Sequence, residues 1–454
     1  MGYRPKPIEF DPTNPYASDA LDRRPMVDFI AKVLDREDGA LVVSIDSPWG
    51  TGKTTFLKML GAALTERGDR VIELNAWKDD HLSDPLVALL SQLDVVAKAN
   101  LPSATYANLA PKINKAAGIL LRRGSFAAVK LATLGLIDVD KEAEAAISEM
   151  SAGAADDLIQ AYRAERDVLD ALTAQLNELV NLLRAERDTT RVVVFIDELD
   201  RCRPDYAIRM LERVKHVFDA VKVVFVLAVD RKQLESSVAT VYGQGIDSRE
   251  YLRRFIDLDF RLPQADAKDF LRAQLPRLGL DDWFGRRSHR ETREDGEIAI
   301  EVLAALANQL SFSLRVQLRC LMMLRLVADQ TPDSDRLHAA LTSLLIVLRV
   351  GRPDAYQDAV SGHIGLVELV GALGLGANKF EPNRATKVAL ASFFWGDRNE
   401  ERRALARVQL SNSDEPWLKS LVDLLDPSRH GFDFPSIRHL ARKIDLANNL
   451  RGED

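Results

Sequence analysis

Short apolar runs and amphipathic segments alternate at the start of the chain. The run at residues 41–45 (Leu-Val-Val-Ser-Ile) ends at a turn, and a similar run follows at 71–74, so both predict buried strands. Between them, apolar residues recur at helical spacing from Thr54 to Glu66, and Gly68 is placed to end that helix. A strand, a helix and a second strand in this order form a βαβ unit, which implies parallel strands joined by a right-handed crossover.

Three further strands are predicted later in the chain. Residues 192–196 and 221–229 are almost continuously apolar, which is typical of central parallel strands covered on both faces. Residues 256–262 alternate between apolar and charged positions, so this strand is expected nearer an edge. After Pro263 the strand signals stop, and amphipathic segments predict helices only. The whole pattern predicts an α/β fold, a parallel sheet sandwiched by helices, followed by an all-helical C-terminal region.

A long segment separates the second predicted strand from the third. From about Leu82 to Asp188 it is rich in Ala, Leu, Glu and Arg and poor in turn signals, which predicts a mainly helical insertion. Its stripe of apolar residues at 155–187 fits either a coiled-coil arm or a helix packed against the sheet. We therefore expect an irregular leader at 1–18, a core at 19–265 with the insertion at about 82–188, and a helical region at 266–454.

The composition says more about the compartment in which the protein works than about its function. The chain has 454 residues and a formal net charge of −7, so it offers nucleic acid no general attraction. Its two cysteines form no CxxC pair, and we expect a reducing compartment, the cytoplasm. A membrane-spanning helix needs about 18–20 apolar residues in a row. Charged side chains interrupt the nearest candidate, residues 116–137, so no integral membrane segment is expected.

One stretch departs from the acidic balance of the chain. Residues 101–137 contain no Asp or Glu, and their basic side chains are Lys112, Lys115, Arg122, Arg123 and Lys130. This pattern fits either a solvated helix face or a surface that contacts a polyanion or an acidic partner. Nucleic acid therefore stays open as a partner on this observation alone.

A glycine-rich loop joins the first predicted strand to the first predicted helix. Its residues are Ser47, Pro48, Trp49, Gly50, Thr51, Gly52, Lys53, Thr54 and Thr55. They match GxxxxGK[ST], except that Ser47 replaces the first glycine. Small residues let backbone amides converge on a phosphate, and the helix N-terminus adds partial positive charge. A chance turn before a helix is the alternative, but the flanking strand and helix favour a phosphate-binding loop.

Each side chain of this loop has an expected role if the loop binds a triphosphate. Lys53 would bridge the β- and γ-phosphates, and the Thr54 hydroxyl would ligate Mg²⁺. Thr55 would lie near the α-phosphate, and Gly50 could supply the flexibility that Ser47 lacks. The loop therefore predicts a nucleotide and Mg²⁺ as cofactors.

An acidic pair, Asp197-Glu198, directly follows the third predicted strand. Ligands of open parallel sheets bind at the carboxyl ends of the strands, which is where these carboxylates are expected. Asp197 would hold Mg²⁺, and Glu198 would orient and activate the water that attacks the γ-phosphate. An acidic turn after a strand is the alternative. For Asp200 and Arg201, which follow, an intramolecular salt bridge is favoured over contact with nucleotide.

With its phosphate loop and its acidic pair, the sequence resembles the KAP family of P-loop NTPases over about residues 16–330. The matching segments are Trp49–Thr54, Asn75–Trp77, Phe195–Pro204, Leu227–Arg231 and Tyr251–Phe255. The resemblance implies an ATPase core with an extra strand between the phosphate-loop strand and the acidic strand, and a helical insertion between the two motifs. It also implies adenine as the base. In many members the insertion carries membrane helices, and bacterial members are linked to phage exclusion.

Three further positions are candidates with alternatives. Asp230 follows a central strand, where it would either sense the γ-phosphate or cap the next helix. Arg254, beside Arg253, would be either an arginine finger that reaches a neighbouring subunit or part of a surface pair. Arg315, in the helical region, could reach the phosphates from a lid.

The sequence thus supports an ATPase whose hydrolysis drives a conformational change, through contacts with further copies of the chain or with protein partners. A nucleotide-gated scaffold with slow hydrolysis is the second interpretation, and a DNA-sensing or DNA-translocating protein is the third. Glu198 favours the first interpretation, and the basic stretch at 101–137 is the support for the third.

Overall fold

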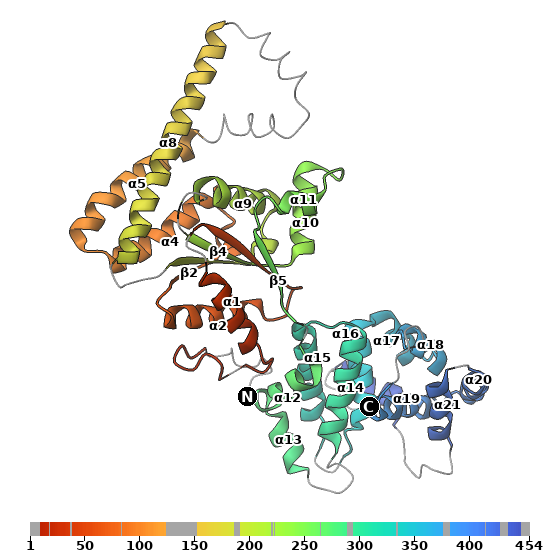
Figure 1. Cartoon of the computed structure of the whole chain (residues 1–454). Helices are drawn as coiled ribbons and strands as arrows, with labels where there is room; N and C mark the ends of the chain where they lie inside the picture. The colour runs from red at the N-terminus through yellow and green to blue at the C-terminus, as the bar shows by residue number, and fades with distance from the viewer. Residues whose placement is uncertain are drawn as a thin grey trace, which may run out of the picture.

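The computed structural model places a strand-bearing core above a compact helical region (Figure 1). Residues described are 10–17, 19–36, 39–82, 84–123, 152–185, 191–218, 221, 223–263, 265–287, 294–332, 335–375, 382–413, 415–426 and 435–445. Part of the leader and residues 124–137 of the basic stretch therefore lie outside the described residues. None of the described helices is both long and apolar enough to cross a membrane.

The core is built on a five-stranded sheet in the order β2-β3-β4-β1-β5. The strands are β1 (Leu41–Asp46), β2 (Arg70–Asn75), β3 (Val192–Asp197), β4 (Val223–Val229) and β5 (Leu258–Arg261). All neighbours pair in parallel, which confirms the fold class predicted from the apolar runs. β4 lies between β1 and β3, as the family resemblance implies, and β5 lies at an edge. The carboxyl ends of all five strands consequently meet at one edge of the sheet.

Side chains alternate along the strands and build one apolar layer on each face of the sheet. Val43, Ile45 and Phe195 point to one face, where they pack against α1 (Arg24–Leu34) and α2 (Lys53–Glu66). The opposite face carries α4 (Pro85–Asn100), α9 (Pro204–Phe218) and α10 (Arg231–Tyr242), which bury Val42, Val194 and Phe225, among others. Both faces are covered, which explains why β3 and β4 are apolar at nearly every position.

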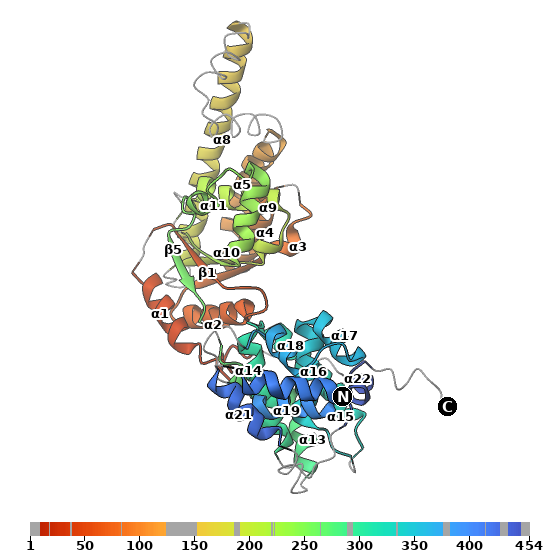
Figure 2. The same cartoon turned by 90° about the vertical axis from the view of Figure 1, so that its right-hand side faces the viewer.

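The described part of the insertion is helical. α3 (Ala76–Asp79) leads from β2 toward it, and its described helices are α4, α5 (Ser103–Arg123) and α8 (Ala152–Ala185). The second half of α8 buries Leu172, Leu176, Leu179 and Leu183 in the core, so this part packs as a core helix and not as a coiled coil. The first half extends beyond the core in both views (Figures 1 and 2). Two short helices, η1 (Leu199–Arg201) and α11 (Ser248–Leu252), complete the core.

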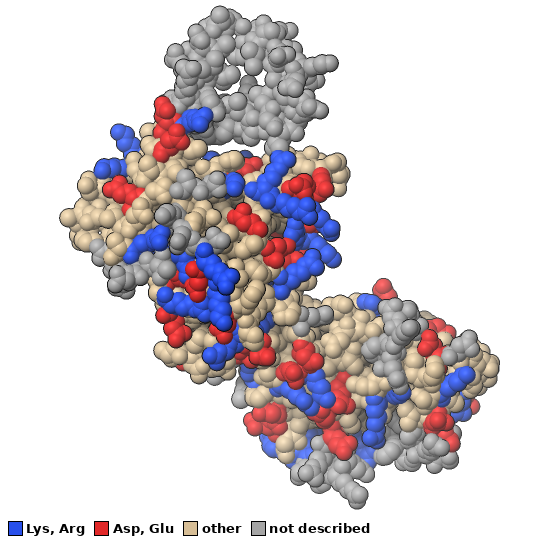
Figure 3. Space-filling view, in the orientation of Figure 1, with Lys and Arg blue, Asp and Glu red and all other residues tan. Residues whose placement is uncertain are grey.

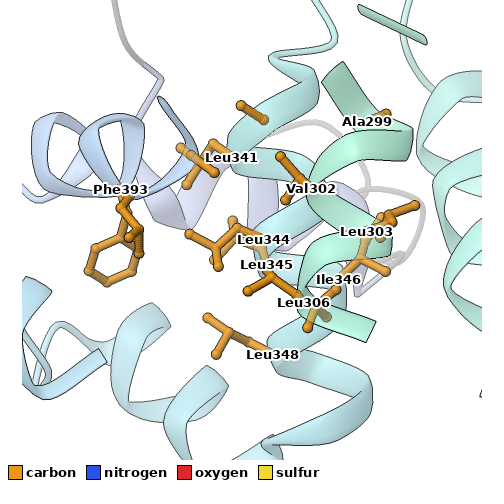
Figure 4. Close-up of a cluster of buried hydrophobic side chains, with 14 of the residues drawn as sticks. Ala299, Val302, Leu303, Leu306, Leu341, Leu344, Leu345, Ile346, Leu348 and Phe393 are labelled. Atoms are coloured by element: carbon orange, nitrogen blue, oxygen red, sulfur yellow. The ribbon is translucent and has the colours of Figure 1, made fainter. Parts of the chain in front are cut away.

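After β5 the described chain is helical, as predicted. The helices are α12 (Ala267–Leu278), α13 (Leu280–Arg286), α14 (Asp295–Gln309), α15 (Leu314–Asp329), α16 (Ala339–Gly351), α17 (Pro353–Ser361), α18 (Leu366–Ala372), α19 (Arg384–Gly396), α20 (Glu400–Ser411), α21 (Pro416–Leu424) and α22 (Ile437–Ile444). They share a separate apolar core centred on α14, α16 and α19, where Leu306, Leu345 and Phe393 are fully buried (Figure 4). The helical region therefore has its own core and meets the strand-bearing core at its edge.

Candidate nucleotide-binding site

The glycine-rich loop joins β1 to α2 at the carboxyl edge of the sheet. Gly50 and Gly52 have φ angles of 77° and 90°, a conformation that other residues rarely adopt. A Cβ atom at Gly50 would lie 3.0 Å from the Ser313 Oγ and from the Arg315 Cβ, so a larger residue would have to push these neighbours aside. Ser47 replaces the first glycine of the motif, and Gly50 and Gly52 supply the backbone freedom that the turn needs. α2 begins at Lys53, directly after the loop.

The Lys53 ammonium is folded back onto its own loop. Its Nζ donates to the Ser47 carbonyl at 2.5 Å and lies 3.9 Å from the Asp200 Oδ2. Burial lowers the pKa of Lys53, and the nearby carboxylates of Asp200, Asp230 and Asp197 oppose that shift. Phosphate oxygens are stronger acceptors for an ammonium than a carbonyl is. A bound phosphate can therefore replace the Ser47 carbonyl as the partner of Lys53.

Thr54 and Asp197 face each other across the space between α2 and β3. The Thr54 hydroxyl donates to the Asp197 Oδ2 at 2.6 Å, and the Glu198 amide donates to the Asp197 Oδ1 at 2.8 Å. Burial raises the pKa of Asp197, while the hydrogen bond from Thr54 lowers it. The structure thus brings together the two residues that the sequence assigned to Mg²⁺, although they are 143 positions apart.

Glu198 is fixed at both carboxylate oxygens. The Asn75 amide donates to its Oε2 at 2.9 Å, and the Arg201 guanidinium forms an ion pair with its Oε1. Arg201 also lies over the ring of Trp77, 5.6 Å from its centroid, and Glu198 itself has a φ of 61°. Such a conformation is uncommon for a non-glycine residue and persists only where its surroundings hold it. The expected salt bridge of Arg201 therefore exists, and its partner is the candidate base.

Asp200 connects the phosphate loop to the carboxyl end of β4. Its Oδ2 accepts from the Trp49 indole at 2.5 Å and from the Asp230 amide at 3.0 Å. Its Oδ1 is buried and has no hydrogen-bond partner among the described residues. Burying a carboxylate oxygen without a hydrogen-bond partner costs free energy. The Asp200 Oδ1 is therefore an unused hydrogen-bond acceptor within the described part of the folded chain.

The three weaker candidates occupy different places. Asp230 is buried and caps α10 through the Lys232 amide at 3.2 Å, and burial raises its pKa. Arg315 lines the same cavity as Lys53, and its amide hydrogen-bonds the Gly50 carbonyl at 3.3 Å.

Arg254 lies elsewhere, exposed beside the ring of Tyr251 at 6.0 Å. It belongs to the flank with α10 and α11, where Lys and Arg gather in the view of Figure 3. Within one chain, therefore, Arg315 is at the site and Arg254 is not among the residues that line it.

Two polar residues at the site had no assigned role in the sequence. Asn75 ends β2 and pairs in register with Asp197, so the register of the sheet places its amide beside Glu198. Arg23 precedes α1 and donates to the carbonyls of Thr51 and Gly52. Which strand ends meet depends on the order of the strands in the sheet, which the apolar runs alone do not give. No local pattern indicates that residue 23 reaches the loop.

A cavity of about 100 Å³ lies at the centre of this arrangement. Its walls are Trp49, Gly50, Gly52, Lys53, Thr54, Asp197, Glu198, Asp200, Arg201 and Arg315. Pockets for small molecules usually measure about 300–1,000 Å³, so this cavity is small for a whole nucleotide. Lys53 and Thr54, which line it, now contact Ser47 and Asp197. Thr54 and Asp197 offer hard oxygen ligands, which fits Mg²⁺ completed by phosphate oxygens and water. No cluster of three or more His, Cys, Asp or Glu able to hold a metal occurs within the described ranges.

A parallel sheet with a phosphate loop on one strand and an acidic pair two strands away defines a P-loop NTPase. The sequence pattern of the KAP family P-loop domain matches residues 23–327, and the chain belongs to that family. Among solved structures, the chain is similar to ORC2 of Aeropyrum pernix in its ADPNP–ADP complexes. The two share 15 % identity over 94 % of each chain, with a TM-score of 0.33.

A second similar structure is AMPPCP-bound DnaA from Aquifex aeolicus. Its identity is 12 % over 94 % of this chain and 89 % of that one, and the TM-score is 0.27. None of the curated proteins compared with the chain matches it. The family assignment therefore rests on the sequence match over residues 23–327.

Proposed function

We propose that this KAP-family NTPase binds ATP with Mg²⁺ and hydrolyses it. The observation that carries the proposal is the 2.6 Å contact between Thr54 and Asp197, with Lys53 and Glu198 on the same cavity. When bound, Mg²⁺ would neutralise charge on the phosphates, and Thr54 and Asp197 are the residues that would hold it. ATP as the nucleotide follows from the family resemblance.

In this proposal Lys53, the loop amides and Glu198 have one role each. Lys53 exchanges the Ser47 carbonyl for phosphate oxygens, and the loop amides bind the remaining phosphate charge. Glu198 orients the attacking water and accepts its proton through the acceptor positions that remain on its carboxylate, while Asn75 and Arg201 hold that carboxylate in place.

We further propose that the nucleotide cycle moves the helical region at 266–454 relative to the core at 19–265. At the start of α15, the Arg315 amide donates to the Gly50 carbonyl, and Ser313 lies where it would crowd a side chain at Gly50. A phosphate that expands the loop would therefore displace them. Arg315 would contact the phosphates in the closed form. Arg254 stays a prediction as a finger that acts on a neighbouring copy of the chain, since it is exposed on another surface.

Two substitutions test the ATPase assignment. Lys53→Ala should abolish detectable ATP binding, because no other ammonium lines the cavity among the described residues. Glu198→Gln should keep ATP bound and lower turnover by about 10²–10⁴-fold, the usual contribution of a general base. Binding is measured by calorimetry and turnover by phosphate release. Hydrolysis by Glu198→Gln at the wild-type rate would show that Glu198 is not the base.

A slow, nucleotide-gated scaffold is the second candidate function, and the double restraint on Glu198 favours it. In that case ATP binding would change the exposure or partners of the helical region, while single-turnover hydrolysis stays near the uncatalysed rate. Proteins retained by the Glu198→Gln variant with ATP but not by Lys53→Ala depend on bound nucleotide. Proteins retained by hydrolysing wild type but by neither variant depend on turnover.

The cellular location and the biological role are proposed from the family resemblance. We propose a cytoplasmic role in bacterial anti-phage defence, to be tested by plaque counts with wild type against Glu198→Gln. For a DNA-sensing or translocating role, Lys112 and Lys115 are exposed on α5. Binding that weakens steeply with salt and is lost on neutralising these two lysines would support it.

A further inference from the structure

Arg23 is a buried arginine that contacts the phosphate loop from behind. Its side chain is 2 % exposed, and its two terminal nitrogens donate to the carbonyls of Thr51 at 2.7 Å and Gly52 at 3.3 Å. Its backbone amide is fixed in turn by the Asp19 carboxylate at 2.7 Å. A planar guanidinium is therefore held against two consecutive carbonyls of the loop.

The direction of these carbonyls sets the direction of the neighbouring amides. In a planar trans peptide the C=O and the following N–H point to opposite sides. Because the carbonyls of Thr51 and Gly52 point to Arg23, the amides of Gly52 and Lys53 point away from it. Gly52 and Lys53 line the cavity, and Arg23 does not, among the residues described there. The guanidinium thus orients the Gly52 amide through the Thr51 carbonyl. It shares the orientation of the Lys53 amide with the Phe56 amide, which also donates to the Gly52 carbonyl, at 3.0 Å.

We propose that Arg23 is a positioning residue for the phosphates, and that it acts by holding the amides of Gly52 and Lys53 in the orientation that binds them. The inference rests on the nucleotide-binding function proposed above. The guanidinium also places a positive charge behind the loop and polarises both peptides, which strengthens their N–H groups as donors. Burial lowers the pKa of Arg23 to about 10, so the charge is present at neutral pH.

This role predicts that phosphate affinity, and not the chemical step, depends on Arg23. Amides that bind substrate and transition state alike contribute uniform binding, so their loss raises KM and leaves kcat nearly unchanged. The loss of a charged hydrogen-bond partner corresponds to a roughly tenfold or larger rise in Kd. Because the amides bind phosphate and not the base, ATP and inorganic tripolyphosphate should be affected by similar factors.

The test compares Arg23→Met, Arg23→Lys and the matched control Arg24→Met in the full chain. Arg24 is the next residue, is 67 % exposed at its side chain, and pairs only with Asp28 among the described ion pairs. Kd for ATP and for tripolyphosphate, kcat and the thermal midpoint are measured for each. Arg23→Met should raise both Kd values about tenfold or more with kcat within about threefold, Arg23→Lys should recover part of the affinity, and Arg24→Met should match wild type.

Several outcomes would overturn the inference. An unchanged Kd in folded Arg23→Met, or a loss for ATP without a loss for tripolyphosphate, would show that Arg23 does not act through the phosphate amides. A purely structural role would lower the thermal midpoint and the active fraction while Kd stays constant. If Arg23→Met does not fold, the same criteria apply to Arg23→Lys. Failure of wild type to bind ATP would refute the proposed function and this inference together, whereas binding unaffected by Arg23 refutes the inference alone.

Discussion

The two ends of the sheet both bury charge, and they do so in opposite ways. At the amino end, Arg191 before β3 forms a two-point contact with Asp69 before β2, Nε and Nη2 each donating at 2.9 Å. The same guanidinium reaches Asp35 at 2.7 Å and the Leu34 carbonyl. The paired oxygens of Asp69 are both satisfied, and the arrangement ties α1, β2 and β3 together.

At the carboxyl end the buried charges are less well matched. The Lys53 ammonium lies 3.9 Å from Asp200, whose Oδ1 has no partner within the part of the chain described here. Glu198 has a left-handed backbone, with a φ of 61°. The charges at the amino end are fully paired and stabilise the fold, whereas the carboxyl end keeps polar groups available for a ligand.

The largest effect is expected at the amino end. Arg191→Met leaves Asp69 buried without its partner, and breaking a buried ion pair from one side costs about 3–5 kcal/mol of unfolding free energy. Urea unfolding followed by circular dichroism measures this loss. The sheet separates this pair from the nucleotide site by the length of a strand, about 15–20 Å, so the ATP affinity of the folded protein should not change.

The matched control removes both buried charges together. Arg191→Met with Asp69→Leu should regain most of the stability, because an apolar pair needs no compensation for lost hydration. Asp35 is half-exposed and stays hydrated. If Arg191→Met alone unfolds at the wild-type urea concentration, the amino end does not stabilise the fold in the way described, and the contrast between the two ends disappears.

The sequence was sufficient for the features that local patterns encode. Continuous apolar runs located β3 and β4, alternation placed β5 at an edge, and spacing in the loop located Lys53 and Thr54. These features depend on the period of each element and on backbone chemistry within a few residues. The order of the strands came from the family resemblance, since apolar runs alone do not say which strand lies between which.

The remaining features depend on contacts between distant parts of the chain. Asn75 meets Glu198 across 123 positions, and Arg23 reaches Thr51 across 28. Arg315 and Arg254 looked equivalent as candidates, and only the docking of α15 onto Gly50 separates them. Such contacts are fixed by register and helix packing, for which one sequence contains no local signal.

A smaller effect of opposite sign is expected at the carboxyl end. In Asp197→Asn the amide keeps the shape of the carboxylate and can still bond Thr54 and the Glu198 amide, while a buried charge is removed. The ligand-free variant should be more stable than wild type by about 0.5–2 kcal/mol, as is common where function restrains stability. Thermal unfolding measures the difference. With Mg²⁺ and ATP the order should reverse, because ligand stabilises wild type alone; a variant less stable without ligand would contradict the comparison.

The smallest effect is the pH dependence of that gain. Burial holds the pKa of Asp197 above its ordinary value in the folded chain. Such a carboxyl contributes to stability when protonated, below its unfolded pKa, and loses that contribution as pH rises through its folded pKa. The advantage of Asp197→Asn should therefore be complete at about pH 7.5 and shrink as pH falls toward about 4. Thermal midpoints of wild type and variant, measured in parallel without nucleotide, give the difference at each pH and cancel the titration of other groups. An advantage that stays constant over this range would show that the Asp197 charge does not strain the carboxyl end.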